Sequence, residues 1–200
     1  MTSTKLKKGF FDMDGVLYDS MPHHAHSWTK ALAAQGIPYS EADTYENEGR
    51  TSTGTIQLAY RRHLNREATH EEVESIYQHK TKIVSELPQP AIMPGIQAFM
   101  ALVKNEGFEV MVVTGSKQPS LLKRLENDFG ILPSNVVSGK DVTHEKPHPE
   151  PYEKALAKCM IAPKEALVIE NAPLGVLSAK GAKIFTVAVN TGPLDDSVLA

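Results

Sequence analysis

The chain contains little that could place it in a membrane or in an oxidising compartment. It has a single cysteine, Cys159, in 200 residues, which excludes a disulfide framework and a cysteine-based metal cluster. No stretch approaches the roughly 18 consecutive apolar residues of a membrane helix, and the basic segment 1–8 is not followed by the apolar run of a signal peptide. We therefore expect a cytoplasmic protein with no membrane partner.

An excess of charge of one sign is also missing. Lys plus Arg is 21 and Asp plus Glu is 24, which gives a net charge of -3. This balance provides no basic surface for a nucleic-acid partner. Hydrophobic residues make up 41% and charged residues 22%, as in ordinary globular proteins. The length fits one domain, or one domain with a smaller insertion, and we expect a monomer.

Short apolar runs alternate with helical patterns along most of the chain. The runs cover residues 9–11, 109–114, 135–137, 166–169 and 184–189, and the helical patterns cover 95–105, 119–128, 151–160 and 173–180. Each run is apolar on both faces, which is typical of a parallel sheet covered by helices. The alternation predicts an α/β fold with a Rossmann-like parallel-sheet core.

The segment between residues 20 and 91 has no convincing strand. Thr69 and Glu72 are spaced as a capping box, and a stripe at helical spacing follows it, made of Val73, Ile76, Tyr77, Lys80, Ile83, Val84 and Leu87. A similar stripe begins at Trp28. We predict a helical cap domain over 21–91, inserted into a core formed by 1–20 and 92–200. The alternative is a single, larger helical layer.

Two carboxylates provide the strongest indication of chemistry. Asp12 and Asp14 come where the first apolar run ends, two residues apart, so their side chains point the same way. The carboxyl ends of strands in open α/β sheets border the ligand crevice. Mg²⁺ would relieve the repulsion between the two acids, and an ionised carboxylate can attack phosphorus without a separate base. The alternative is helix capping or a structural calcium site.

Three later segments supply groups that suit a phosphate. Thr114, Gly115 and Ser116 follow the second run and offer hydroxyl and backbone N–H groups. Lys146 lies in a loop flanked by prolines, where its ammonium group can neutralise developing charge. Glu170 and Asn171 end the fourth run with an oxygen ligand pair. Each segment alone is weak evidence, but their shared position at strand ends makes phosphoryl transfer the favoured chemistry.

The chain carries four motifs in the order Asp-x-Asp-Gly, Thr-Gly-Ser, Lys-Pro-x-Pro and Glu-Asn. In these motifs and their order it resembles the haloacid dehalogenase (HAD) superfamily. The Asp-Gly-Val-Leu segment resembles the β-phosphoglucomutase-like subgroup of that superfamily. The resemblance implies a HAD-like core with an inserted four-helix cap of the C1 type. It makes Asp12 the nucleophile that forms an aspartyl-phosphate and Asp14 the acid and base. Thr114, Ser116 and Lys146 would hold the phosphate. The cofactor would be Mg²⁺, held by Asp12, the Asp14 carbonyl, Glu170 and Asn171.

The sequence departs from this subgroup in two places. The subgroup often has an acid where Asn171 stands, so Asn171 is expected to reach Mg²⁺ through water. Related chains usually continue through another strand and helix after the segment that ends at Ala200, so we expect a shortened form.

The loop formed by residues 45–54, which we call the cap loop, guides the choice of substrate. Sugar-phosphate mutases of the subgroup carry Lys and Arg where this chain has Glu48 and Ser52, and a carboxylate there opposes a bisphosphate. With Glu48 as a further Mg²⁺ ligand and Arg50 beside it, the loop resembles the inorganic pyrophosphatase branch. The alternative for Glu48 is an ion pair with Arg50 or Arg61 in solvent.

Smaller assignments follow from position. His24 matches a histidine that responds to cap closure in related mutases, so we place it near the substrate, although a surface position fits equally well. Asp19 and Ser20 are expected to cap the first cap helix, and Cys159 and Met160 to pack in the core.

The leading hypothesis is a Mg²⁺-dependent phosphohydrolase acting on a small phosphorylated substrate, with inorganic pyrophosphate as the best guess. The alternative is a β-phosphoglucomutase or a broad sugar-phosphate phosphatase. A phosphorylated signalling module is disfavoured, because such modules lack a helical insertion after the first strand.

Overall fold

Five parallel strands form one sheet at the centre of the protein. The computed structural model describes residues 6–117 and 119–199, so residues 1–5 of the expected core segment, and residues 118 and 200, lie outside the described residues. The strands are β1 (Lys8–Phe11), β2 (Glu109–Val113), β3 (Val136–Val137), β4 (Ala166–Glu170) and β5 (Phe185–Ala188). Their order in the sheet is β3-β2-β1-β4-β5. The predicted α/β fold is confirmed.

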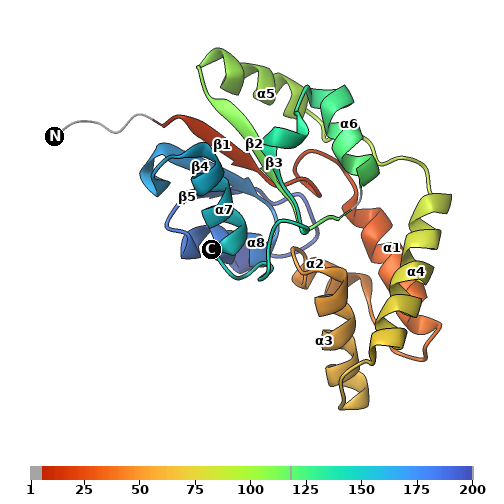
Figure 1. Cartoon of the computed structure of the whole chain (residues 1–200). Helices are drawn as coiled ribbons and strands as arrows, with labels where there is room; N and C mark the ends of the chain where they lie inside the picture. Colours follow the sequence, from red (N-terminus) through yellow and green to blue (C-terminus); the bar gives the residue numbers. More distant parts are fainter. Residues whose placement is uncertain (1–5, 118, 200) are drawn as a thin grey trace.

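Helices cover both faces of the sheet, as the apolar runs predict (Figure 1). Neighbouring residues of β1 point to opposite faces, so Phe11 joins a cluster with α5 (Ile96–Asn105) and α6 (Pro119–Phe129). Phe10 joins the other cluster, with α7 (Glu150–Cys159) and α8 (Pro173–Gly181). β1 is therefore buried on both sides, and the residues that follow it emerge at a rigid edge.

The edge strand β5 departs from the predicted pattern. The prediction that every apolar run is covered on both faces is wrong here, because Phe185 is 69% exposed and Val187 38% exposed. β5 pairs only with β4 in the described sheet, and α8 is the helix that contacts it most. An edge strand has a neighbour on one side only, so an apolar run there need not be buried.

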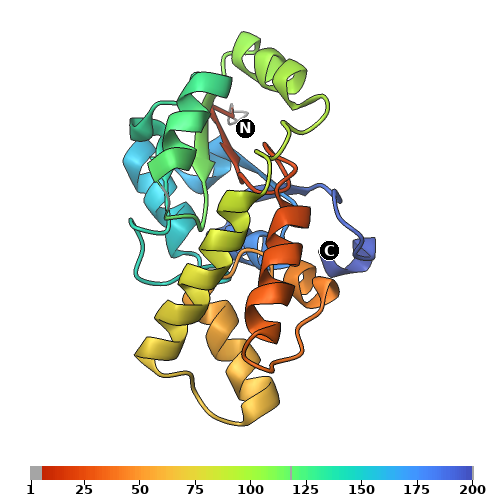
Figure 2. The same ribbon diagram turned by 90° about the vertical axis from the view of Figure 1, so that its right-hand side faces the viewer.

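Four helices form a separate layer below the sheet (Figure 2): α1 (Met21–Ala33), α2 (Glu41–Glu46), α3 (Ser52–Leu64) and α4 (His70–Glu86). Helices α1, α3 and α4 share a hydrophobic cluster that includes Trp28, Ile56 and Ile76. The capping box at the start of α4 is confirmed, since Thr69 and Glu72 exchange hydrogen bonds with each other's backbone N–H. The exact division at residues 21 and 91 stays a prediction. We call the α1–α4 layer the cap.

The two segments that connect the sheet with the cap lie side by side. Tyr18 and Ile92 form an antiparallel bridge. The Asp19 N–H donates to the Ala91 carbonyl (2.9 Å), and the Met93 N–H donates to the Leu17 carbonyl (2.9 Å). The cap is thus joined to the sheet through one short, hydrogen-bonded ribbon.

The structure places Cys159 and Met160, both predicted to pack in the core, in different surroundings. Cys159 is partly buried and lies beside Met111 in the cluster under α7. Met160 is 91% exposed, so its predicted packing role is wrong. It adopts a left-handed conformation with φ of 53° as α7 ends, and this turn carries its side chain away from the core. Among the described residues, no helix is both long and apolar enough to traverse a bilayer.

Candidate active site

Asp12, Lys146 and Glu170 form a buried charged group at the carboxyl edge of the sheet. Asp12 follows β1, and its backbone N–H continues the pairing by donating to the Ile169 carbonyl (3.0 Å). The Lys146 ammonium donates to Asp12 Oδ1 (2.7 Å), to Glu170 Oε1 and to the Val113 carbonyl (3.3 Å). All three side chains are almost inaccessible to solvent. The lysine therefore links the ends of β1, β2 and β4.

Glu170 is fixed by hydrogen bonds on both of its oxygens. Besides Lys146, Oε1 accepts from the Tyr152 hydroxyl (2.9 Å), and Oε2 accepts from the backbone N–H groups of Asn171 and Ala172 (3.0 Å each). Gly175 leaves room for this carboxylate, because a Cβ there would lie 1.8 Å from Oε1. In this arrangement Glu170 orients the lysine, and its lone pairs are largely committed to protein donors.

Asp14 faces a second set of partners, on the side of the cap. Its Oδ1 accepts from the Ser20 hydroxyl (2.6 Å) and lies 3.3 Å from His24 Nε2. The other ring nitrogen, Nδ1, lies 2.9 Å from the Lys80 ammonium. The expected cap role of Ser20 is wrong, because its side chain makes no hydrogen bond to the start of α1. His24 contacts Asp14, and its place near the substrate stays a prediction.

Burial and neighbouring charges shift the pKa values of the two acids in opposite directions. Burial and the nearby Glu170 raise the pKa of Asp12 to about 7, although Lys146 opposes the shift. Burial also acts to raise the pKa of Asp14, but His24, Ser20 and Lys80 outweigh it and bring the value to about 2. In the free protein, a proton is therefore held more readily by Asp12 than by Asp14.

The segment after β2 forms a turn beside this group. The Thr114 Oγ1 atom accepts from the Ser116 N–H (3.1 Å), and the Ser116 carbonyl accepts from the Gly139 N–H (3.1 Å). Gly139 must be small, since a Cβ there would lie 2.3 Å from the Gly115 carbonyl oxygen. Thr114, Gly115 and Lys146 line one small pocket, so the predicted phosphate-binding residues are close together.

Glu48 reaches from the cap to the sheet. Its Oε1 accepts from Asn171 Nδ2 (2.8 Å), and the side chain is buried. Glu48 therefore does not form the solvent-exposed ion pair that was the alternative for it. Arg61, one of the two partners considered, pairs with Glu67. Burial raises the pKa of Glu48 well above its usual range; the Asn171 hydrogen bond opposes the shift, and the charges of Asp12 and Glu170 add to it. Within the described residues, Asn171 Oδ1 is buried without a hydrogen-bond partner.

A cleft of about 800 Å³ separates the cap from the sheet, and its lining includes Asp12, Asp14, His24, Glu48, Arg50, Gly115 and Ser116. Arg50 is half-buried, and its Nε lacks a partner among the described residues. The cap loop closes one side, where Thr51 N–H donates to Glu145 Oε2 (2.6 Å). A volume of this size suits a small organic ligand.

A family model for haloacid dehalogenase-like hydrolases matches residues 10–183, which include every predicted site residue. The chain belongs to the haloacid dehalogenase-like hydrolase family. The family assignment agrees with the sheet, the inserted helices and the acids at the strand ends described above.

Relatives within the family have different activities. β-Phosphoglucomutase of Bacillus subtilis is 24% identical over 94% of this chain and 84% of its own. Hexitol phosphatase A of Escherichia coli is 28% identical over 92% of this chain and 83% of its own. A solved structure described as "Putative beta-phosphoglucomutase from Bacteroides vulgatus" is 48% identical, with a TM-score of 0.94 over 99% of this chain and 81% of that one. None of these three is described as a pyrophosphatase.

Sequence reasoning missed three residues of this candidate site. Lys80 was placed in an apolar stripe, but a lysine in the middle of such a stripe is itself a signal that a buried partner exists. Tyr152 and Glu145 carried no local pattern that points to the site. Tyr152 supports Glu170 from α7, and Glu145 holds the cap loop; both contacts depend on how the elements are arranged in space.

Proposed function

We propose that the protein is a Mg²⁺-dependent phosphohydrolase that uses Asp12 as its nucleophile and takes small sugar monophosphates as substrates. The observation that carries the proposal is the buried group of Asp12, Lys146 and Glu170 at the edge of the cleft. Lys146 is fixed by Glu170 and directed at Asp12, which is the arrangement that a charged nucleophile and a phosphate dianion require.

The acidic residues around Lys146 fit a hard cation. Asp12, Glu48 and Glu170 are buried together. Burial raises the pKa of both Asp12 and Glu48, and the charge of Glu170 adds to both shifts. The unpartnered Asn171 Oδ1 adds a neutral oxygen. Oxygen donors of this kind suit Mg²⁺. Asp12, the Asp14 carbonyl, Asn171 and Glu48 would hold the ion. Glu170, the fifth ligand expected, would support them through Lys146, because its own oxygens are engaged.

When bound, Mg²⁺ would supply positive charge that lowers the pKa of Asp12 and neutralises the transferred phosphoryl group. Asp12 then attacks phosphorus, and the bond from phosphorus to the leaving oxygen breaks as Asp14 gives that oxygen a proton. A phosphate dianion beside Asp14 favours the protonated acid in the bound state. Water next attacks the aspartyl-phosphate, Asp14 takes the water proton, and phosphate leaves.

The sugar-phosphate assignment rests on the relatives and on the cleft. The β-phosphoglucomutase is named for a sugar substrate and the hexitol phosphatase for a sugar alcohol, and a cleft of about 800 Å³ has room for either. A mutase must also hold a second phosphate. Glu48 and Ser52 line the cleft at the positions where the mutases carry Lys and Arg, and neither can supply positive charge. We therefore favour hydrolysis over isomerisation.

Inorganic pyrophosphate is the second candidate, and Glu48 is the observation that favours it. A buried cap carboxylate beside Asn171 could share a cation with a small and highly charged substrate. For Glu48→Ala, we expect a larger loss of pyrophosphate cleavage than of aryl phosphate cleavage if pyrophosphate is the substrate. Equal losses on the two substrates would remove this candidate.

The deciding experiment is phosphate release with and without Mg²⁺ from a panel of sugar monophosphates and pyrophosphate, with β-glucose 1-phosphate isomerisation measured alongside. We expect the highest kcat/KM on a sugar monophosphate and no isomerisation. The Asp12→Asn variant should lose roughly 10³-fold or more in kcat while its circular dichroism stays unchanged. Steady turnover by this variant would contradict the nucleophile assignment, and a dominant kcat/KM for pyrophosphate would favour the second candidate.

A further inference from the structure

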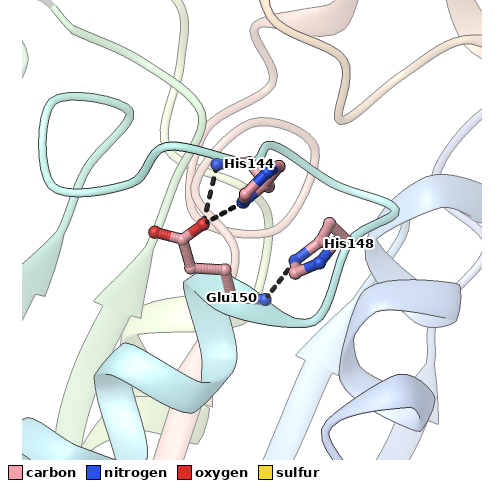
Figure 3. A group of neighbouring side chains, drawn as sticks. All are labelled: His144, His148 and Glu150. Carbon is pink, nitrogen blue, oxygen red and sulfur yellow. Dashed lines mark hydrogen bonds and ion pairs between the residues drawn. The ribbon is translucent and has the colours of Figure 1, made fainter.

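Three side chains with metal-binding atoms gather on the loop that carries Lys146 and on the helix that follows it (Figure 3). His144 and His148 lie on the loop, and Glu150 is the first residue of α7. One ligand atom from each residue lies within 4.8 Å of the other two. The two imidazole rings stack with centroids 4.5 Å apart and planes 29° apart. The group thus presents two ring nitrogens and a carboxylate at the surface.

The hydrogen bonds within this group define which atoms carry lone pairs. His148 Nδ1 accepts from the Glu150 backbone N–H (3.1 Å), so this nitrogen carries the lone pair of the neutral ring and Nε2 carries its proton. A metal ion bound at Nδ1 would take the place of this hydrogen bond. His144 Nδ1 lies 2.8 Å from Glu150 Oε2, which also accepts from the His144 backbone N–H (2.7 Å). One proton therefore lies between a ring nitrogen and a carboxylate oxygen. A metal ion can take the place of that proton, while the ring keeps its neutral form by carrying the proton on Nε2.

The Glu150 carboxylate is fixed by hydrogen bonds on both of its oxygens. The Thr143 N–H donates to Oε1 (2.8 Å) and the His144 N–H donates to Oε2 (2.7 Å). Its Oε1 atom also lies 3.1 Å from the Lys154 ammonium. The carboxylate is thus held in one orientation from both sides, and its Oε2 faces the His144 ring.

We propose that His144, His148 and Glu150 form a surface binding site for Zn²⁺ or a similar divalent transition metal, with water completing the coordination. Two imidazole nitrogens and one carboxylate are a ligand set that Zn²⁺ accepts. Mg²⁺ prefers oxygen atoms and binds imidazole poorly, so this site is chemically distinct from the one proposed at Asp12. The proposal does not depend on the function proposed above.

The position of the group gives metal binding a structural effect. The loop is already held by a hydrogen bond from the His148 N–H to the Glu145 carbonyl (2.8 Å) and by one from the Ser178 hydroxyl to the His148 carbonyl (2.6 Å). An ion shared by His144, His148 and Glu150 would join the two sides of the loop that carries Lys146. It would raise the melting temperature by binding the folded state selectively.

The test is isothermal titration of the full chain with Zn²⁺ in the presence of excess Mg²⁺, which occupies oxygen-rich sites. We expect the double variant His144→Ala/His148→Ala to bind at least tenfold more weakly than the natural chain. His79→Ala, which removes an exposed histidine from α4, should stay within twofold. Equal affinity in the natural chain and the double variant, or the larger loss in His79→Ala, would overturn the proposal.

A second measurement distinguishes the loss of a metal-binding side chain from unfolding of the variant protein. Co²⁺ bound by two imidazoles and a carboxylate should give visible d–d absorption, and Glu150→Gln should weaken it while the circular dichroism stays unchanged. We also expect Zn²⁺ to raise the melting temperature of the natural chain and not that of His144→Gln. A spectrum and a melting shift that survive both single substitutions would place the metal elsewhere.

Discussion

Lys146 lies between two buried carboxylates, and the proposed chemistry at the edge of the sheet depends on the interaction between these three charges. Its ammonium contacts both Asp12 and Glu170. Burial alone would lower the pKa of Lys146, but the two carboxylates raise it well above its usual range. The lysine therefore stays charged throughout the working range of pH, and it holds Asp12 next to the turn formed by Thr114 and Ser116.

Glu170 provides a prediction at the scale of a single residue. Replacing it with Gln removes the charge that balances Lys146 and turns one acceptor oxygen into a donor facing other donors. We expect Glu170→Gln to lower the free energy of unfolding in urea by roughly 3–5 kcal/mol. Tyr152→Phe removes one hydrogen bond from the same carboxylate and should cost about 1 kcal/mol. A loss below 1 kcal/mol for Glu170→Gln would contradict the structural role given to this residue.

At the scale of the helices, α4 brings a buried lysine against α1. Lys80 is 5% exposed, lies 2.9 Å from His24 Nδ1, and has its ammonium 5.3 Å from the centre of the Trp28 ring. Burial lowers the pKa of Lys80 to about 8, although Asp14 opposes the shift. Between pH 8 and about 10.5, the unfolded chain therefore binds more protons than the folded chain at this position.

This difference predicts how stability depends on pH. The free energy of unfolding of the natural chain should rise relative to that of Lys80→Met as pH increases from 8 to 10.5, by roughly 3 kcal/mol in total. The measurement is urea unfolding of both proteins across this range. Lys82→Met, at an exposed position on the same helix, is the matched control and should change stability by no more than about 0.5 kcal/mol. A constant difference between Lys80→Met and the natural chain would contradict the prediction.

The regular elements were largely predictable from the sequence, and the exceptions have physical reasons. The strands and the start of α4 follow from apolar runs and a capping box, which are local signals. Ser20 occupies the expected cap position, but its hydroxyl bonds to Asp14 because the chain turns after Gly15 and brings the two together. The exposure of β5 depends on its place at the edge of the sheet, and no local pattern reports that place.

The same distinction applies to the site. Asp12, Thr114, Lys146 and Glu170 could be found because each belongs to a short sequence motif, three of them at strand ends and Lys146 in a loop that leads through two prolines into α7. Lys80 and Glu145 act through contacts with residues 56 and 94 positions away along the chain. Such contacts result from the packing of helices and strands that are far apart in the sequence, and short sequence motifs do not predict them.

At the scale of the whole molecule, two contacts hold the cap loop against the sheet: Glu48 with Asn171, and Thr51 with Glu145. Glu145→Ala removes the carboxylate that accepts from the Thr51 N–H. We expect amide exchange in residues 49–54 to become roughly tenfold faster, while the β1 and β2 amides stay unchanged. Hydrogen exchange with mass spectrometry is the measurement, and Glu153→Ala, exposed on α7, is the control. Unchanged exchange at Thr51 in Glu145→Ala would show that this contact does not hold the loop.

The ribbon at Tyr18 and Ile92 has a consequence for how this molecule can change over evolutionary time. The cap begins and ends at neighbouring points of the sheet. With respect to the sheet it is therefore an inserted loop whose two ends lie side by side. The entropy cost of closing a loop grows only slowly, by about 0.6 kcal/mol for each doubling of its length. Cap helices can therefore be lengthened, shortened or exchanged at small cost to the rest of the fold. Selectivity can then diversify while the reactive centre is inherited intact.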